Sequence, residues 1–330
     1  MSLSIPRPVL PAYAELQCLS NFSFLRGAAW PQDLVARAQA LGYEALALTD
    51  ECSVAGVVRA HGEAKRLGFK LIIGAQFRLP PDPVPGSDPS LGDPGGQLVL
   101  LATNRRGYGQ LCQLITQVRA GQPKGAYQLG WADLQASPAR LADCLALWSP
   151  ERDHPPEAAA LAQVAQGLAA SFPGRAWLAV RRWLRMDDAR WLEALQAAGQ
   201  ACGLPLVAVG DVHLHRRSDK PLHDVLSAIR LRLPVADCGL SLQANAEAHL
   251  RSRLRLATLF PPELLAESVR VAARCRFSLD ELRYERSEER RVGKECGRWC
   301  RSRWSPRTRP RCAPASSRSE ERFSRNAETD

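Results

Sequence analysis

Two acidic residues far apart in the sequence each follow a short apolar run, and they are the first candidates for chemistry. Asp50, with Glu51 beside it, follows one run, and Asp211 follows another, with His213 two residues further on. Residues two apart in an extended chain point to the same side, so Asp211 and His213 are expected to share one surface. A carboxylate and an imidazole are common ligands of zinc and manganese. A hydrogen-bonded buried pair is the other interpretation, and the pattern leaves both open.

The remaining histidines and the cysteines show no comparable pattern. His215 and His223 follow in an arginine-rich stretch, so we predict that they are solvated. None of the ten cysteines forms a CxxC pair, which argues against a zinc ribbon and favours reduced, buried thiols. P-loop and dinucleotide glycine fingerprints are absent from the sequence, as are motifs for Ser, Cys or Lys nucleophiles.

Alternating apolar runs and helical periods must position these residues. The predicted strands cover residues 44–48, 71–74, 97–103, 144–148, 176–180 and 206–209. Helical patterns separate most of them, which predicts parallel pairing in an α/β barrel or a doubly wound sheet. The proline- and glycine-rich stretch 80–96 is predicted to be a surface loop. Four further helices, without strands between them, are predicted to close the fold over residues 219–278: 221–230, 246–250, 254–259 and 262–275.

The net charge of +10 is concentrated at the end of the chain. Residues 286–330 carry 13 Lys and Arg against 7 Asp and Glu, which leaves a net charge of only +4 over residues 1–285. This tail has few apolar residues and no periodicity, so we predict that it is disordered. Its residues 287–296 resemble a translated adapter or vector peptide, which predicts a non-native tail. Charge alone therefore does not indicate that the folded part binds nucleic acid.

The rest of the composition favours a soluble protein. At 45% hydrophobic residues the chain can bury a sizeable core, yet no apolar run approaches the roughly 20 residues of a membrane span. The first residues lack the basic and apolar regions of a secretory signal. We therefore predict a cytoplasmic protein with no membrane partner.

Several long blocks of the sequence, in the right order, resemble the amino-terminal region of error-prone C-family DNA polymerases, homologues of the polymerase III alpha subunit. The blocks are YAELQCLSNFSFLRGA (13–28), LGYEALALTDECSVAGVVRAH (41–61), LGFKLIIGAQFRL (67–79), LVLLATNRRGYGQLCQLIT (98–116), residues 205–252 and VAARCRFSLDELRYE (271–285). The resemblance implies a distorted (β/α)7 PHP barrel, the polymerase-and-histidinol-phosphatase type, over residues 13–278. It also implies a flexible stretch at 1–12 and the start of a palm region at 279–285.

The resemblance further implies a metal cluster at the strand ends, and this sequence departs from its ligand pattern. The family's first motif, His-x-His, reads Gln17 and Leu19 here. Glu51 replaces the histidine of Thr-Asp-His, and Gln76 replaces the glutamate of Gly-x-Glu. The matching ligands are Asp50, Asp211 and His213, which could still hold one Zn²⁺ or Mn²⁺ ion with help from Glu51. We expect a degenerate metal site without hydrolytic activity.

By the same resemblance, the parent enzyme is a DNA-directed DNA polymerase that synthesises DNA across damage. Its palm aspartates hold Mg²⁺ and lie beyond residue 285, so this chain alone is expected to be inactive. The implied partners are DNA and deoxynucleoside triphosphates through the missing polymerase region, together with mutasome proteins and the sliding clamp. Two alternatives stay open: a stand-alone PHP-type metal-dependent phosphoesterase, and a non-catalytic structural or interaction module.

Overall fold

The computed structural model describes residues 10–80, 95–135, 138–152 and 157–282. They belong to the first of two compact units, Met1–Leu282. The predicted tail, residues 1–9 of the predicted amino-terminal stretch and most of the predicted surface loop lie outside the described residues.

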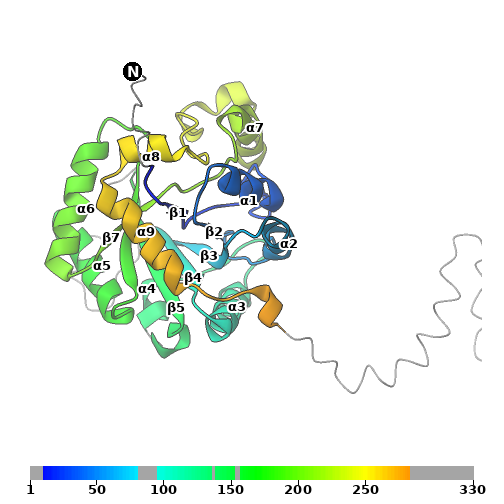
Figure 1. Ribbon diagram of the computed structural model, residues 1–330. Helices are drawn as coiled ribbons and strands as arrows, with labels where there is room; N and C mark the ends of the chain where they lie inside the picture. The colour runs from blue at the N-terminus through cyan, green and yellow to red at the C-terminus, as the bar shows by residue number, and fades with distance from the viewer. Residues whose placement is uncertain (1–9, 81–94, 136–137, 153–156, 283–330) are drawn as a thin grey trace, which may run out of the picture. The chain divides into compact units, whose positions relative to one another are not determined.

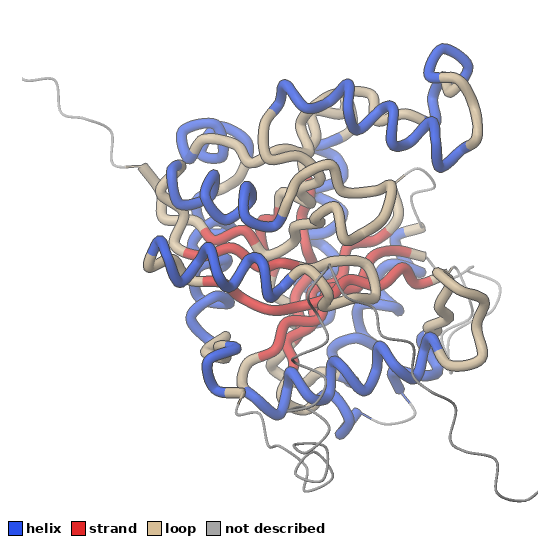
Figure 2. The backbone as a smooth tube through the Cα atoms, turned by 90° about the vertical axis from the view of Figure 1, so that its right-hand side faces the viewer, coloured by secondary structure: helices blue, strands red, loops and turns tan. Residues whose placement is uncertain are grey.

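A seven-stranded sheet forms the centre of this unit, with helices on both sides of it (Figure 2). The strands pair in the order in which they occur along the chain: β1 Ala14–Glu15, β2 Ala45–Leu48, β3 Leu71–Leu79, β4 Gly96–Ala102, β5 Cys144–Pro150, β6 Ala176–Arg181 and β7 Leu206–Val209. An isolated parallel bridge between Cys18 and Val212 joins the segments that follow the first and last strands. The sheet is therefore a nearly closed barrel, as predicted.

The prediction of uniformly parallel strands is wrong at β4. Strands β1 to β3 and β5 to β7 pair in parallel, whereas β4 is antiparallel to both of its neighbours. The connection that precedes it is rich in proline, glycine and aspartate, which disfavour a crossover helix. Parallel neighbours need a crossover connection, usually a helix, so such a composition favours antiparallel pairing. This reversal is the distortion of the barrel.

Helices separate most of the strands, as predicted. They are α1 Pro31–Ala40, α2 Val57–Leu67, α3 Arg105–Arg119, α4 Trp131–Gln135, α5 Ala158–Ser171, α6 Asp188–Cys202, α7 Lys220–Leu231, α8 Arg253–Leu259 and α9 Pro262–Arg274. Helix α9 packs against β1 and β7 and crosses the strands in Figure 1. Two of its buried residues, Val271 and Ala272, join a core cluster with Val99, Leu101 and Val207 of the strands.

The strand face that packs against α9 also carries side chains of the candidate site. Successive side chains of a strand alternate between its faces, so Gln97 lies on the face of Val99 and Leu101. By the same alternation, Arg181 lies on the face of Trp177 and Ala179. The apolar cluster under α9 thus changes to polar side chains at the strand ends.

The predicted helix over residues 246–250 is not formed. The carbonyl oxygen of Ala248 instead accepts hydrogen bonds from the backbone N–H groups of His213 (2.9 Å) and Leu214 (3.0 Å). A parallel bridge pairs Leu214 with His249. This extended segment therefore holds the chain that follows β7, including His213, against the rest of the unit.

Candidate functional site

Asp211 and His213 lie together at the carboxyl end of β7. The Nε2 atom of His213 is 3.2 Å from Oδ1 of Asp211, and the Asp211 side chain is fully buried. The preceding Gly210 is required by close approach, because a Cβ atom there would lie 2.3 Å from a carboxylate oxygen of Glu15. Asp211 itself has a φ of +46°, which an L-residue adopts only when its surroundings hold it there.

The side chain of Arg181, the last residue of β6, contacts the Asp211 carboxylate. Its Nη1 atom donates to Oδ2 of Asp211 (2.8 Å) and to Oε1 of Gln97 (3.3 Å), and its Nη2 atom donates to the Pro150 carbonyl (3.1 Å). Arg181 is 7% exposed. Burial alone would raise the pKa of Asp211, but the adjacent His213 and Arg181 lower it to about 2. The carboxylate is therefore ionised and paired with a cation of the protein itself.

Gln17 and Gln76, at two of the positions where the family resemblance implies metal ligands, join a network of amides. The Nε2 atom of Gln17 donates to Oε1 of Gln97 (2.7 Å) and to Oε1 of Gln76 (3.3 Å). Gln17 and Gln76 are buried, and the network links the segments of β1, β3 and β4. Since Gln97 also accepts from Arg181, the amides and the guanidinium form one connected polar layer.

Asp50 differs from Asp211 in its partners, because its carboxylate accepts hydrogen bonds from the residues of one loop. Oδ1 accepts from the backbone N–H of Ser20 (2.8 Å) and from Oγ of Ser23 (2.7 Å), and Oδ2 accepts from Oγ of Ser20 (2.8 Å). Gly56 approaches so closely that a Cβ atom would lie 2.8 Å from Oδ2. Burial raises the pKa of Asp50 against these hydrogen bonds. Asp50 therefore organises the loop after β1.

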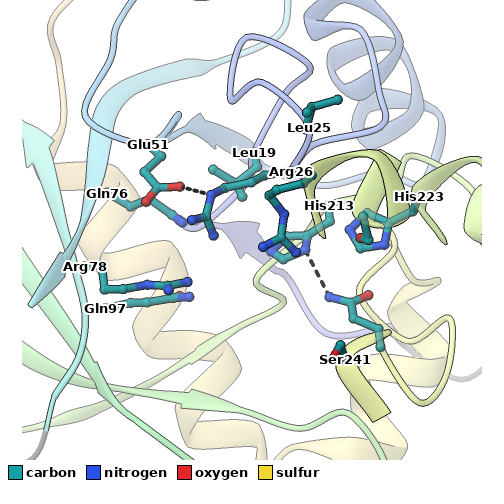
Figure 3. Close-up of a pocket in the computed structure, with 13 residues that line it drawn as sticks. Leu19, Leu25, Arg26, Glu51, Gln76, Arg78, Gln97, His213, His223 and Ser241 are labelled. Atoms are coloured by element: carbon teal, nitrogen blue, oxygen red, sulfur yellow. Dashed lines mark hydrogen bonds and ion pairs between the residues drawn. The ribbon is translucent and has the colours of Figure 1, made fainter. Parts of the chain in front are cut away.

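Glu51 points away from Asp50 and forms an ion pair at the edge of a cavity. Its Oε2 atom lies 2.6 Å from Nε of Arg26, and its Oε1 atom accepts from the Tyr127 hydroxyl (3.0 Å). Figure 3 shows the ion pair of Arg26 and Glu51 as a dashed line, with His213 drawn among the residues that line the same cavity. The cavity has a volume of about 110 Å³, and Arg78 and Arg230 also line it.

His213 and His223 face each other at the wall of this cavity, and the prediction that His223 is solvated is wrong. The centroids of the two rings lie 5.6 Å apart. His223, on α7, is only 5% exposed. Burial, and then the neighbouring His213, lower the pKa of His223 to about 4, so it is neutral at physiological pH. His215, also predicted to be solvated, lies 2.9 Å from Asp219 in an ion-pair position and is partly exposed.

These residues do not fit the metal cluster that the family resemblance implies. Within the described ranges, no three His, Cys, Asp or Glu side chains come together as a metal site. Asp50 already accepts three hydrogen bonds from serines, and Asp211 is paired with Arg181. Gln17 and Leu19 supply an amide and an aliphatic group at the first two ligand positions.

Arg181 and Gln97 are the site residues that sequence reasoning missed. A signal was present, because the run Ala176–Val180 is entirely apolar and is followed at once by Arg181, and the next predicted strand leads to Asp211. A charged residue at the end of a buried strand needs a partner, and β6 pairs with β7 so that Arg181 lies opposite Val209. The register was needed to see that Asp211 is that partner.

Comparison with known proteins agrees with this fold. The model of the PHP domain matches residues 15–185, and the chain belongs to this family. The chain is also similar to the error-prone DNA polymerase of Dechloromonas aromatica, with 52% identity over 282 residues, and to that of Methylococcus capsulatus, with 53% identity over 273 residues. These matches cover 85% and 83% of this chain, and 26% and 24% of the relatives. The chain therefore spans about a quarter of their length, and the resemblance read from the sequence is confirmed.

Among solved structures, the chain is similar to an amidohydrolase from Chromobacterium violaceum with bound sulfate. The TM-score is 0.44 at 16% identity, over 61% of this chain and 88% of that one. So low a score carries no conclusion about activity. In the part of the chain that the structure describes, no helix is both long enough and apolar enough to span a bilayer.

Proposed function

We propose that this chain is the amino-terminal PHP domain of an error-prone DNA polymerase that copies damaged DNA, and that its barrel supports the polymerase without hydrolysing phosphate esters. The observation that carries the second part is the buried ion pair between Arg181 and Asp211, 2.8 Å apart. A fixed guanidinium supplies positive charge where the family resemblance implies metal ions.

The electrostatics favour this arrangement over a retained metal ion. A cation bound to Asp211 and His213 would lie beside Arg181, and like charges at such short range repel. Moving Arg181 aside would break its bonds to Gln97 and the Pro150 carbonyl as well. Removing one partner from a buried ion pair typically costs about 3–5 kcal/mol. The guanidinium therefore competes strongly with any ion at this position.

The polymerase reaction itself belongs to the longer relatives. We propose that the full-length protein uses palm aspartates and Mg²⁺ to join deoxynucleoside triphosphates to a primer on DNA, in the cytoplasm. Mutasome proteins and the sliding clamp are its proposed partners. The similarity to error-prone polymerases over 85% of this chain supports this reading. The proposed role of the present domain is to stabilise that larger enzyme.

Metal content and phosphatase activity test the proposal on the purified chain. After incubation with Zn²⁺ or Mn²⁺ and gel filtration, elemental analysis should find well under one ion per chain. Hydrolysis of p-nitrophenyl phosphate should stay at background, and Asp211→Asn should change neither result. Stoichiometric metal that Asp211→Asn removes, together with metal-dependent hydrolysis, would instead establish a phosphoesterase.

A further inference from the structure

A second, larger hollow adjoins the cavity at the strand ends. It has a volume of about 710 Å³, and Arg26, Glu51 and Arg78 line both spaces. We call the combined surface the arginine groove. Its charged and aromatic members are Phe22, Phe24, Arg26, Glu51, Arg78, Arg119, Tyr127, His213, His223 and Arg230.

The arginine groove carries an excess of positive charge. Glu51 is the one carboxylate among the described residues that line it, against four guanidinium groups. Arg26 pairs with Glu51, and Arg119 donates from Nε to the Cys52 carbonyl (3.0 Å). Neither Arg78 nor Arg230 has a side-chain hydrogen bond or ion pair within the described ranges, although both line the cavity.

The arginines also affect one another. Burial, followed by the positive charges of Arg26 and Arg78, lowers the pKa of Arg230. Arginine keeps its proton at physiological pH, so the charges of Arg26 and Arg78 repel that of Arg230, and Glu51 offsets part of this repulsion. An anion placed between these side chains would relieve that repulsion and accept hydrogen bonds from them.

Aromatic side chains lie beside the charges. Phe24 is 80% exposed, and both Phe24 and Phe22 line the same hollow. The Arg59 guanidinium covers the Phe22 ring at 5.7 Å and the half-exposed Trp30 ring at 5.3 Å. Arginines that follow a backbone, interleaved with open aromatic faces, are the combination that holds single-stranded nucleic acid.

We propose that the arginine groove binds a short stretch of single-stranded nucleic acid. Phosphates lie against Arg26, Arg78 and Arg230, and a base stacks on Phe24. A duplex keeps its bases stacked inside and has none free for Phe24, and the aspartate and glutamate side chains of an acidic peptide carry no ring to stack on it. The site requires no metal and does not depend on the polymerase reaction proposed above.

Fluorescence anisotropy with a fluorescein-labelled oligothymidylate of 12 nucleotides tests the charge component on the whole 330-residue chain. The double variant Arg78→Ala/Arg230→Ala should bind about tenfold more weakly or worse, because both arginines contact phosphate. The slope of log affinity against log salt should fall by about 1.4, at about 0.7 per phosphate contact on a single strand.

A variant of equal charge is the control. Arg66→Ala/Arg106→Ala also removes two arginines, which pair with Glu63 and Asp143 outside the groove. It should keep wild-type affinity. The basic residues after 286 are the same in both variants, so binding to them would give equal affinities. Equal affinities would overturn the proposal.

The aromatic component separates nucleic acid from other polyanions. Phe24→Ala should weaken binding about fivefold or more with no change in the salt slope, as loss of one stacked base does. Polyglutamate of matched charge should compete poorly with the oligonucleotide. If polyglutamate competes equally well and Phe24→Ala has no effect, the groove is an acidic-peptide site and the assignment is wrong.

Discussion

Asp50 and Asp211 occupy equivalent places in the barrel, each directly beyond a strand end, yet their surroundings differ in kind. Neutral serine and backbone donors surround Asp50, and burial raises its pKa. Asp211 faces Arg181 and His213, which together lower its pKa to about 2 despite complete burial. An aspartate at a ligand position is therefore weak support for a metal, because one of these side chains orders a loop and the other balances a charge.

Among the substitutions that test this contrast, removal of Arg181 should cause the largest loss of stability. Arg181→Ala leaves Asp211 buried without its guanidinium partner and should lower the free energy of unfolding by about 3–5 kcal/mol. Urea denaturation followed by circular dichroism measures the change. Arg181→Lys keeps the charge but cannot reach all three acceptors, so it should lose less. A loss below about 1 kcal/mol in the alanine variant would contradict the role of this ion pair.

The serines around Asp50 should have an intermediate effect. Ser20→Ala/Ser23→Ala removes two of the three side-chain and backbone donors and leaves the carboxylate one hydrogen bond from the Ser20 backbone. A loss of about 2 kcal/mol is expected, as for a buried acceptor left unsatisfied. Proteolysis in the loop over residues 20–29 should also become faster. Unchanged stability together with an unchanged cleavage rate would show that Asp50 does not organise this loop.

The two aspartates should also give opposite dependences of stability on pH. Asp211 has a lowered pKa in the folded state, so its contribution is present above the ordinary value of 3.8 and is lost as pH falls towards 2. Asp50 has a raised pKa, so its contribution is present below 3.8 and is lost as pH rises through its folded pKa. Urea denaturation between pH 2.5 and 6 measures both effects. As pH falls, the midpoint of Asp211→Asn should decrease less than that of the wild type. As pH rises, the midpoint of Asp50→Asn should also decrease less than that of the wild type. Identical pH profiles for the two variants would contradict the distinction between the two aspartates.

Glu51 should contribute least to stability, since its pair with Arg26 is partly exposed. Glu51→Gln is expected to change the free energy of unfolding by less than about 1 kcal/mol. It should nevertheless tighten oligothymidylate binding several-fold, because it removes the one carboxylate that lines the arginine groove. Weaker binding by this variant would count against the groove as an anion site.

Much of the barrel was predictable from the sequence, because its strands are short apolar runs buried on both faces and its helices have clear apolar periods. The reversal at β4 was not, since its residues read as any other buried strand and only pairing reveals its direction. Residues 246–250 have a helical composition, but Ala248 accepts long-range hydrogen bonds from the segment after β7 instead. Asp211 and His213 were found from local spacing. Arg181 and His223 required knowledge of which strand and which helix pack beside them.

The most direct test of the central claim is anomalous diffraction from crystals of this chain soaked in Zn²⁺ or Mn²⁺. With Arg181 bonded to Asp211, we predict no anomalous peak within ligand distance, about 2.0–2.2 Å, of the Asp211 carboxylate or the His213 ring. A strong peak there, with the Arg181 guanidinium displaced from Asp211, would contradict the account.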